Sequence, residues 1–322
     1  LKETVRAAAR QRVIEDILSH AILHHVSCLC GNSNRAVLLA SIDRWGLSCS
    51  SVLCVNCGII RINPRWDEQT YEKIYSELYW PMAMGSVKID QKRFDLSISR
   101  AMPYANFLVN HYDLENKDIM ELGCSYGAGL QALKQSSSRL RGYDYDMRML
   151  DYGHQFTKLA LRYGGAKEAI KDGDQFDLII LRHVFEHMLD PQAEIPLLNK
   201  LLKSNGALFI EVPGIFNSNW WLPDPLSYFN NFHAYSYCFH HLDCLMRLNG
   251  FSPLHGDEHI YSIWQKKWEE LEIRWNNKDL VKKIMIHLYA MERKRRWEAF
   301  RNNIISLPKA INLFFRETFI KV

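Results

Sequence analysis

The chain has 322 residues, is 48% hydrophobic and 12% aromatic, and has a formal net charge of +4 from 40 Lys and Arg against 36 Asp and Glu. This composition excludes a disordered chain, and the length is enough for two domains. The apolar runs are too short to span a bilayer, and the first residues form a charged helical pattern rather than a signal peptide. We expect a cytoplasmic protein, and the start at Leu1 in place of Met is what a piece of a longer polypeptide would show.

The positive charge is concentrated at the end of the chain. Residues 266–322 contain 14 Lys and Arg against 7 Asp and Glu, which leaves 26 against 29 in the rest of the chain. A nucleic-acid-binding protein normally carries its basic patch on the surface of its core. The weakly acidic body therefore argues against a nucleic-acid partner.

Helices are predicted on both sides of a cysteine-rich module. Apolar residues at helical spacing predict a helix over residues 1–25, followed by short strands and turns over residues 26–66. Helical patterns return at about 67–80 and 89–111, and we interpret residues 67–115 as a connector or flap.

Four cysteines of the module form two knuckles, Cys28-Leu29-Cys30-Gly31 and Cys54-Val55-Asn56-Cys57-Gly58. Four thiolates complete a closed tetrahedral zinc site, and a glycine after the second cysteine lets the backbone turn toward the sulfur atoms. We predict a structural zinc ion held by Cys28, Cys30, Cys54 and Cys57.

The first knuckle has one residue between its cysteines, where two are usual. Two alternatives therefore stay open. In one, Cys28 is a buried free thiol and the fourth ligand is Cys49, His24 or His25; in the other, the module holds no metal.

From residue 117 strands and helices alternate, which predicts a doubly wound α/β sheet. Strands are expected at about 117–122, 139–144, 176–181 and 207–212, with a weakly marked one within 158–170. Helices are expected from the first strand's turn to about 135, at 146–157, at 191–203 and at 238–249, with two short strands ending at about 265. Residues 116–265 would form this domain, and residues 266–322 a helical extension.

A turn of small residues joins the first of these strands to its helix: Glu121-Leu122-Gly123-Cys124-Ser125-Tyr126-Gly127. Small side chains let the backbone approach a ligand closely. Asp144 follows 23 positions after Glu121, at the end of the second strand, where a carboxylate can accept both hydroxyls of a ribose. Ser125 stands where a dinucleotide site has a glycine, and the alternative is a tight turn with a surface aspartate.

Together these motifs resemble class I S-adenosylmethionine (SAM)-dependent methyltransferases. Five features match the family pattern: the glycine loop, the acid at Asp144, the strand at 176–180, the loop Leu181-Arg182-His183-Val184-Phe185-Glu186-His187, and the turn at 201–206. The resemblance covers residues 100–265 and implies a Rossmann-like seven-stranded sheet. It implies that the cofactor is bound by Glu121, Gly123, Cys124, Ser125, Gly127 and Asp144, and that Leu181, Arg182 and His183 line the floor near the sulfonium.

The cysteine module is similar to that of zinc-ribbon-bearing sugar C-methyltransferases and their relatives in polysaccharide and antibiotic-sugar pathways. The similarity includes the residues that follow the module: Asn63-Pro64-Arg65, Tyr75 and Tyr79. The resemblance implies a methyl acceptor that is a sugar nucleotide or glycan, bound between the two parts of the chain. Two alternatives stay open: another small-molecule or lipid-linked acceptor, and a catalytically inactive scaffold.

Three histidines are candidates for a general base, because imidazole suits that role near neutral pH: His183, His187 and His233. His233 stands where the sugar C-methyltransferases carry a Glu-His pair, but Phe232 replaces the glutamate. This departure weakens the case for C-methylation and leaves O- or N-methylation open. The alternative for His187 and His233 is a structural role. Nearby aromatic residues wall an acceptor pocket or belong to the core: Trp220, Trp221, Tyr228 and Phe229.

The C-terminal extension contains a basic run, residues 293–296, followed by apolar residues from Ile304 to Ile320. A basic helix with an apolar side can lie on an anionic membrane surface or dock on a protein partner. The alternative is an extension that packs on its own domain with a solvated basic face.

Overall fold

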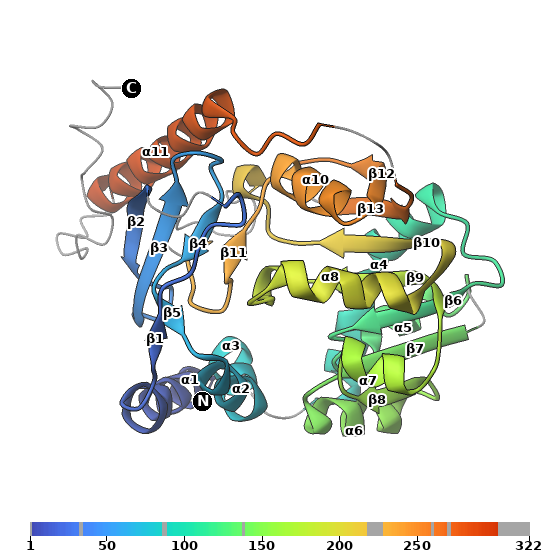
Figure 1. The fold of residues 1–322 in the computed structure, drawn as a ribbon. Coiled ribbons are helices and arrows are strands. Elements are labelled where there is room, and N and C mark those ends of the chain that lie inside the picture. Colours follow the sequence, from blue (N-terminus) through green and yellow to red (C-terminus); the bar gives the residue numbers. More distant parts are fainter. Residues whose placement is uncertain are drawn as a thin grey trace.

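The computed structural model describes residues 2–31, 35–85, 89–136, 139–217, 228–258, 261–268 and 272–301. Figure 1 shows a seven-stranded sheet flanked by helices and, beside it, a smaller four-stranded sheet with its own helices. Trp220, Trp221 and the apolar residues 304–320 lie outside the described residues.

The larger sheet has the strand order β12-β13-β10-β9-β6-β7-β8. Its strands are β6 (Asp118–Leu122), β7 (Arg139–Asp144), β8 (Ala160–Tyr163), β9 (Phe176–Arg182), β10 (Leu202–Glu211), β12 (Phe251–Gly256) and β13 (Tyr261–Lys266). The five strands from β8 to β10 are parallel, and β13 runs antiparallel between β10 and β12. The expected α/β fold is confirmed. Chain order reverses between β6 and β9, and open α/β sheets bind ligands outside the carboxyl ends of their strands at such a point.

Both faces of this sheet are covered because alternate side chains of its central strands point to opposite sides. Ile179 and Leu181 pack with residues of three helices, α7 (Ala166–Lys171), α8 (Pro191–Leu201) and α10 (Phe239–Leu248). Leu178 and Ile180 pack on the other side, with α4 (Gln91–His111) and α5 (Ala128–Leu133). The continuous apolar run of β9 is therefore buried on both faces, as a central parallel strand requires. The helix α6 (Met147–Phe156) connects β7 to β8.

The smaller sheet has the order β11-β4-β3-β2 and combines distant parts of the chain. Its strands are β2 (Ala36–Ile42), β3 (Ser48–Cys54), β4 (Ile60–Ile62) and β11 (Tyr235–Ser236). The predicted cysteine module is thus completed by a strand that lies within the methyltransferase-like segment, a pairing that no local pattern indicates.

The N-terminal helix is shorter than predicted. It comprises α1 (Lys2–Arg12) and a π-helical turn (Val13–Leu18), after which β1 (Leu23–His24) pairs with β5 (Arg65–Trp66). The predicted connector, residues 67–115, forms three helices. Of these, α2 (Glu68–Glu77) and α3 (Tyr79–Met84) share a core with α1, whereas α4 packs on the larger sheet and is part of its covering layer.

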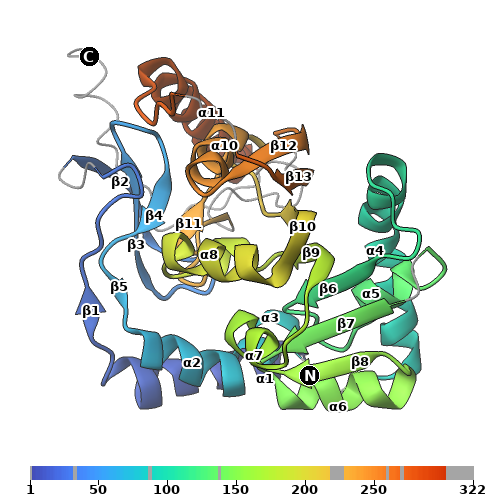
Figure 2. The ribbon, with the colours of Figure 1, turned by 45° about the vertical axis from the view of Figure 1, so that its right-hand side comes forward.

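The helix α11 (Lys278–Arg301) packs against the smaller sheet, as Figures 1 and 2 show. Leu280, Ile284 and Leu288 share a core with residues of β2, β3 and β4. Residues 278–301 of the extension are helical, and the surface that α11 covers belongs to the cysteine module and not to the larger sheet. Within the basic run, Arg295 is buried and bonds to Glu292 at 2.7 Å, so the run is not wholly solvated. Among the described residues no helix could cross a membrane.

Candidate cofactor and acceptor site

The glycine loop between β6 and α5 follows a path that suits small residues. Gly123, Ser125 and Gly127 have φ angles of 66°, 50° and 75°, which lie in the left-handed region that costs least at glycine. A Cβ on Gly123 would lie 2.4 Å from Cγ2 of Val184, so any side chain there would collide with the loop after β9. Ser125 adopts this conformation without being glycine, and its buried hydroxyl has no hydrogen-bond partner among the described residues.

Asp144 ends β7 directly beside this loop. Its Oδ2 accepts a hydrogen bond from the backbone N–H of Ser125 at 2.7 Å, and its Oδ1 accepts one from Asp146 at 2.8 Å. Burial raises the pKa of Asp144, and these backbone N–H groups oppose the shift. Each oxygen keeps a lone pair for a further donor. The orientation suits the predicted contact with two ribose hydroxyls.

Glu121 lies under the loop and is only 3% exposed. Burial raises its pKa to about 7, against the opposing charge of Arg182. The carboxylate fits because Gly129 has no side chain: a Cβ there would lie 2.6 Å from Oε1 of Glu121. Its Oε2 has no hydrogen-bond partner within the described residues.

The remaining residues of the predicted cofactor site contribute in different ways. The side chains of Cys124 and Leu181 are buried in apolar clusters, so only their backbone is available to a ligand. Arg182 forms an ion pair with Glu211 at 3.1 Å and lies over the ring of Tyr104. Its charge is thus largely neutralised within the protein.

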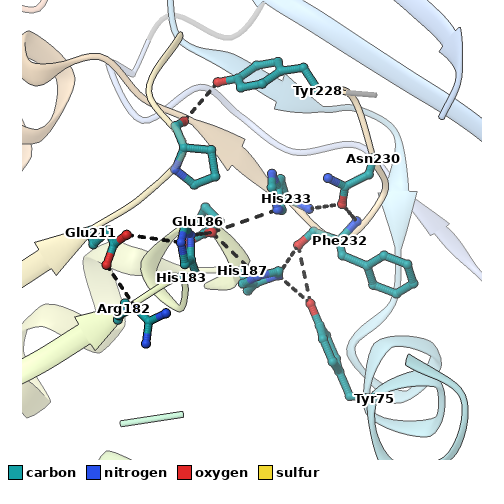
Figure 3. Close-up of polar contacts among 11 residues, drawn as sticks. Tyr75, Arg182, His183, Glu186, His187, Glu211, Tyr228, Asn230, Phe232 and His233 are labelled. Atoms are coloured by element: carbon teal, nitrogen blue, oxygen red, sulfur yellow. Dashed lines mark hydrogen bonds and ion pairs between the residues drawn. The ribbon is translucent and has the colours of Figure 1, made fainter. Parts of the chain in front are cut away.

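Two histidines of the loop after β9, together with His233 from the turn before β11, surround one carboxylate, as Figure 3 shows. Oε1 of Glu186 lies 3.5 Å from Nδ1 of His183, 3.8 Å from Nε2 of His187 and 3.9 Å from Nε2 of His233. Glu186 is 1% exposed, and neither of its oxygens has a hydrogen-bond partner among the described residues. The structure therefore brings together all three predicted catalytic histidines.

The three histidines differ in their surroundings. Partial burial disfavours the charged form of His183, but Glu186 and Glu211 outweigh it and raise its pKa to about 10. Burial lowers the pKa values of His187 and His233. The side chain of His183 is 42% exposed, whereas those of His187 and His233 are 18% and 14% exposed. His183 is thus the one that an incoming ligand reaches first.

The smaller sheet and α2 hold the segment that carries His233. Asn230 accepts hydrogen bonds from the backbone of Phe232 and His233 at 3.0 and 3.1 Å, which folds the segment into a turn. Next to it, Asn231 donates to the buried carboxylate of Asp43 at 3.0 Å. Further contacts come from α2, since Tyr71 donates to the Asn231 carbonyl and Tyr75 to that of Phe232.

Of the aromatic residues predicted to wall a pocket, Tyr228 and Phe229 are buried in the core beneath α11.

Sequence reasoning did not include Glu186 or Glu211 among the site residues. The signal that could have found Glu186 is its spacing, three residues after His183 and one before His187, at the carboxyl end of a central strand.

The four predicted cysteines also come together. The sulfur atoms of Cys28, Cys30, Cys54 and Cys57 lie within 4.8 Å of one another, with separations of 3.4, 3.6 and 3.8 Å for three of the pairs. A tetrahedral zinc site with Zn–S bonds of about 2.3 Å has sulfur atoms about 3.8 Å apart. Cys49, one of the alternative ligands, instead contacts the Ser51 hydroxyl at 3.3 Å. The donor set therefore fits zinc.

A family model described as a methyltransferase domain matches residues 94–255. The chain belongs to the methyltransferase-domain family. This assignment confirms the predicted enzyme class at the level of the family. It covers the β6–β10 sheet, the glycine loop and the histidine-bearing loop, and it leaves out the cysteine module and α11.

Among curated methyltransferases, the ubiquinone biosynthesis O-methyltransferase of Coxiella burnetii is 27% identical over 108 residues, 32% of this chain and 46% of the relative. Its counterpart in Pelagibacter ubique is 29% identical over 101 residues, 30% of this chain and 42% of the relative. The chain thus spans less than half the length of the curated relatives it matches.

Among solved methyltransferases, magnesium protoporphyrin IX methyltransferase from Synechocystis PCC 6803 with bound S-adenosylhomocysteine (SAH) is 17% identical, with a TM-score of 0.44 over 62% of this chain and 98% of that one. A methyltransferase from Haloferax volcanii, in complex with the activator Trm112, is 16% identical, with a TM-score of 0.43 over 62% and 89% of the two chains.

Proposed function

We propose that the chain is a SAM-dependent methyltransferase. The observation that supports this most directly is the Asp144 carboxylate, held by the backbone of the glycine loop at the point where strand order reverses. Glu121, Gly123 and Asp144 would hold SAM, which supplies an electrophilic methyl group when bound. The orphaned oxygen of Glu121 and the space left by Gly123 fit such a ligand.

The acceptor would bind where the histidine cluster meets the cysteine module. The predicted base belongs to this cluster. His187 and His233 are the first candidates, because burial lowers their pKa values and keeps them neutral, whereas the raised pKa of His183 keeps it protonated. Because α2 and the smaller sheet hold His233 in place, the cysteine module acts as one wall of the acceptor site. Enclosure by this wall would exclude water and orient the acceptor toward the methyl group.

The acceptor class that we propose is a sugar nucleotide or glycan. Arg44 is exposed, stacks on Trp45 at 4.2 Å, and lies close enough to lower the pKa values of His187 and His233. A guanidinium in this position suits the phosphates of a nucleotide. The second candidate is the hydroxyl of another small-molecule or lipid-linked acceptor, which the names of the ubiquinone biosynthesis relatives favour.

We also propose that Cys28, Cys30, Cys54 and Cys57 hold a structural zinc ion. The four thiolates leave no open coordination position, which favours a structural role over a catalytic one. His241 on α10 donates from Nε2 to the Cys57 carbonyl at 2.8 Å, so this knuckle is also tied directly to the larger part of the chain.

Titration with SAM and SAH tests the cofactor assignment. We expect micromolar binding by the native chain and at least a 100-fold loss in Asp144→Asn, because the amide cannot accept hydrogen bonds with both of its heavy atoms. The matched control is Asp151→Asn on the exposed side of α6, which should bind normally. Unchanged affinity in Asp144→Asn would refute the ribose assignment. Absence of SAM binding by the native chain would favour an inactive scaffold.

A further inference from the structure

We propose that Glu186, His187 and His233, with His183 beside them, bind one divalent transition-metal ion that is separate from the zinc of the cysteine module. This inference deepens the proposed function, on which it rests, because it gives the acceptor site a Lewis acid. The ligand atoms of Glu186, His187 and His233 all lie within 4.8 Å of one another.

The carboxylate of Glu186 is the first observation that points to an ion. A buried carboxylate is costly unless it is paired or coordinates a metal, and the nearest partner of Glu186 is His183, at a long 3.5 Å. Here three imidazole nitrogens surround one oxygen at 3.5, 3.8 and 3.9 Å, beyond hydrogen-bond range for the last two. An ion bonded to nitrogen and oxygen at about 2.0–2.2 Å separates its ligand atoms by about 3.0–3.5 Å. Binding of an ion would therefore shorten the distances between Glu186 and the histidines by up to about 0.9 Å.

The orientation of two imidazoles is the second observation. Nδ1 of His187 lies 2.7 Å from the Phe232 carbonyl, and donation to that oxygen leaves Nε2 unprotonated and directed at Glu186. In His183 the roles are reversed: Nε2 lies 3.3 Å from a carboxylate oxygen of Glu211, and Nδ1 faces Glu186. Metal-bound histidines almost always engage their second nitrogen in this way. Figure 3 shows the rings of His183 and His187 both directed at the Glu186 carboxylate.

The ligand types select the class of ion. Imidazole nitrogens with one carboxylate suit zinc, iron, nickel or copper, whereas magnesium and calcium prefer oxygen ligands. Because the side chain of His183 is 42% exposed, the ion would stay accessible on that side. A Lewis acid there can bind an acceptor hydroxyl and lower its pKa, or polarise an acceptor carbonyl.

Cobalt loading of the full chain tests the inference. We expect two equivalents of Co²⁺ per chain, measured by elemental analysis. One equivalent shows the intense thiolate-to-cobalt absorption of the cysteine site, and the other shows only the weak d–d bands of nitrogen and oxygen ligands. Glu186→Gln and His187→Asn should each lower the affinity for the second cobalt ion. The loss should exceed the roughly 10–100-fold that follows when a residue hydrogen-bonded to a metal ligand is removed. The thiolate absorption should stay unchanged. The exposed His154→Asn on α6 is the matched control and should keep both equivalents.

A native chain that takes up only the thiolate-bound equivalent overturns the inference whatever the variants do. Retention of the second equivalent in both variants overturns it as well. SAM titration of the same samples separates the two proposals. Binding of SAM without a second cobalt ion defeats only the metal site, and loss of SAM binding by the native chain defeats the proposed function.

Discussion

Replacement of Glu121 by glutamine should change how the stability of the chain depends on pH. The pKa of Glu121 is about 7 in the fold, against 4.5 for an unperturbed glutamate, and burial is the main cause. Between these two values the folded chain keeps a proton that the unfolded chain releases, so the folded state becomes less stable as pH rises. A difference of about 2.5 pKa units corresponds to about 3 kcal/mol. This stability is fully present below pH 4.5 and is lost by the time pH has passed 7.

Urea unfolding from about pH 5 to about pH 8.5 measures this loss. The free energy of unfolding of Glu121→Gln minus that of the native chain should rise across this range by about 2–3 kcal/mol. Subtracting the two curves removes the contribution of every other titrating group that the substitution leaves unchanged. Glu115→Gln, on an exposed turn, is the control and should give a flat difference. A flat difference for Glu121 would refute the argument that burial governs its ionisation.

The same pair of proteins tests whether Glu121, one of the predicted cofactor-binding residues, contacts the charged end of SAM. If its carboxylate faces the methionine ammonium of SAM, the bound cation must favour the charged form. SAM affinity of the native chain should then increase as pH rises from about 6 to about 8, and that of Glu121→Gln should increase less. Parallel pH profiles in the two proteins would place Glu121 away from the cofactor's charge.

Three further outcomes are expected. Asn231→Ala removes one hydrogen bond to the buried carboxylate of Asp43 and one to a backbone carbonyl. Urea unfolding should therefore show a free energy of unfolding lower by about 3 kcal/mol. The exposed Asn110→Ala is the control and should lower it by less than about 0.5 kcal/mol. Arg44→Ala should raise the KM for a nucleotide sugar and leave SAM affinity unchanged; an equal KM in both proteins would exclude a phosphate contact. Cys54→Ser should lose bound zinc and lower the melting temperature, and a native chain that contains no zinc after purification would contradict the zinc assignment.

Local sequence patterns located the parts of the site that depend on short-range geometry. The glycine loop and Asp144 are separated by one strand–helix–strand unit, so the spacing of motifs along the chain fixes their distance in space. The same holds within each cysteine knuckle, where one or two residues separate the two cysteines. The convergence of the two knuckles could be inferred as well, because zinc chemistry requires four ligands.

The histidine cluster shows where such reasoning stops. His183 and His187 could be placed at the carboxyl end of β9, but His233 reaches them only because its turn bonds to Asp43 and Tyr71 of the smaller part. These contacts join residues far apart in sequence, and none has a periodic or spacing signal. The carboxylate of Glu186 was overlooked for a related reason. Its significance lies in its burial and its lack of donors, which are properties of packing and not of the motif.

The arrangement of the two sheets gives the cysteine module a consequence beyond its own stability. The strand β11 pairs with β4 of the module and directly follows the turn that carries His233. The module's loop at Asp43 holds the same turn from the other side. Any event that loosens the cysteine cluster would therefore displace His233 from Glu186 before it disturbs Asp144, whose partners all lie within the larger sheet and its loops. If the cysteines hold zinc as proposed, an ion bound far from His233 in sequence would thus govern the proposed acceptor chemistry while leaving cofactor binding intact.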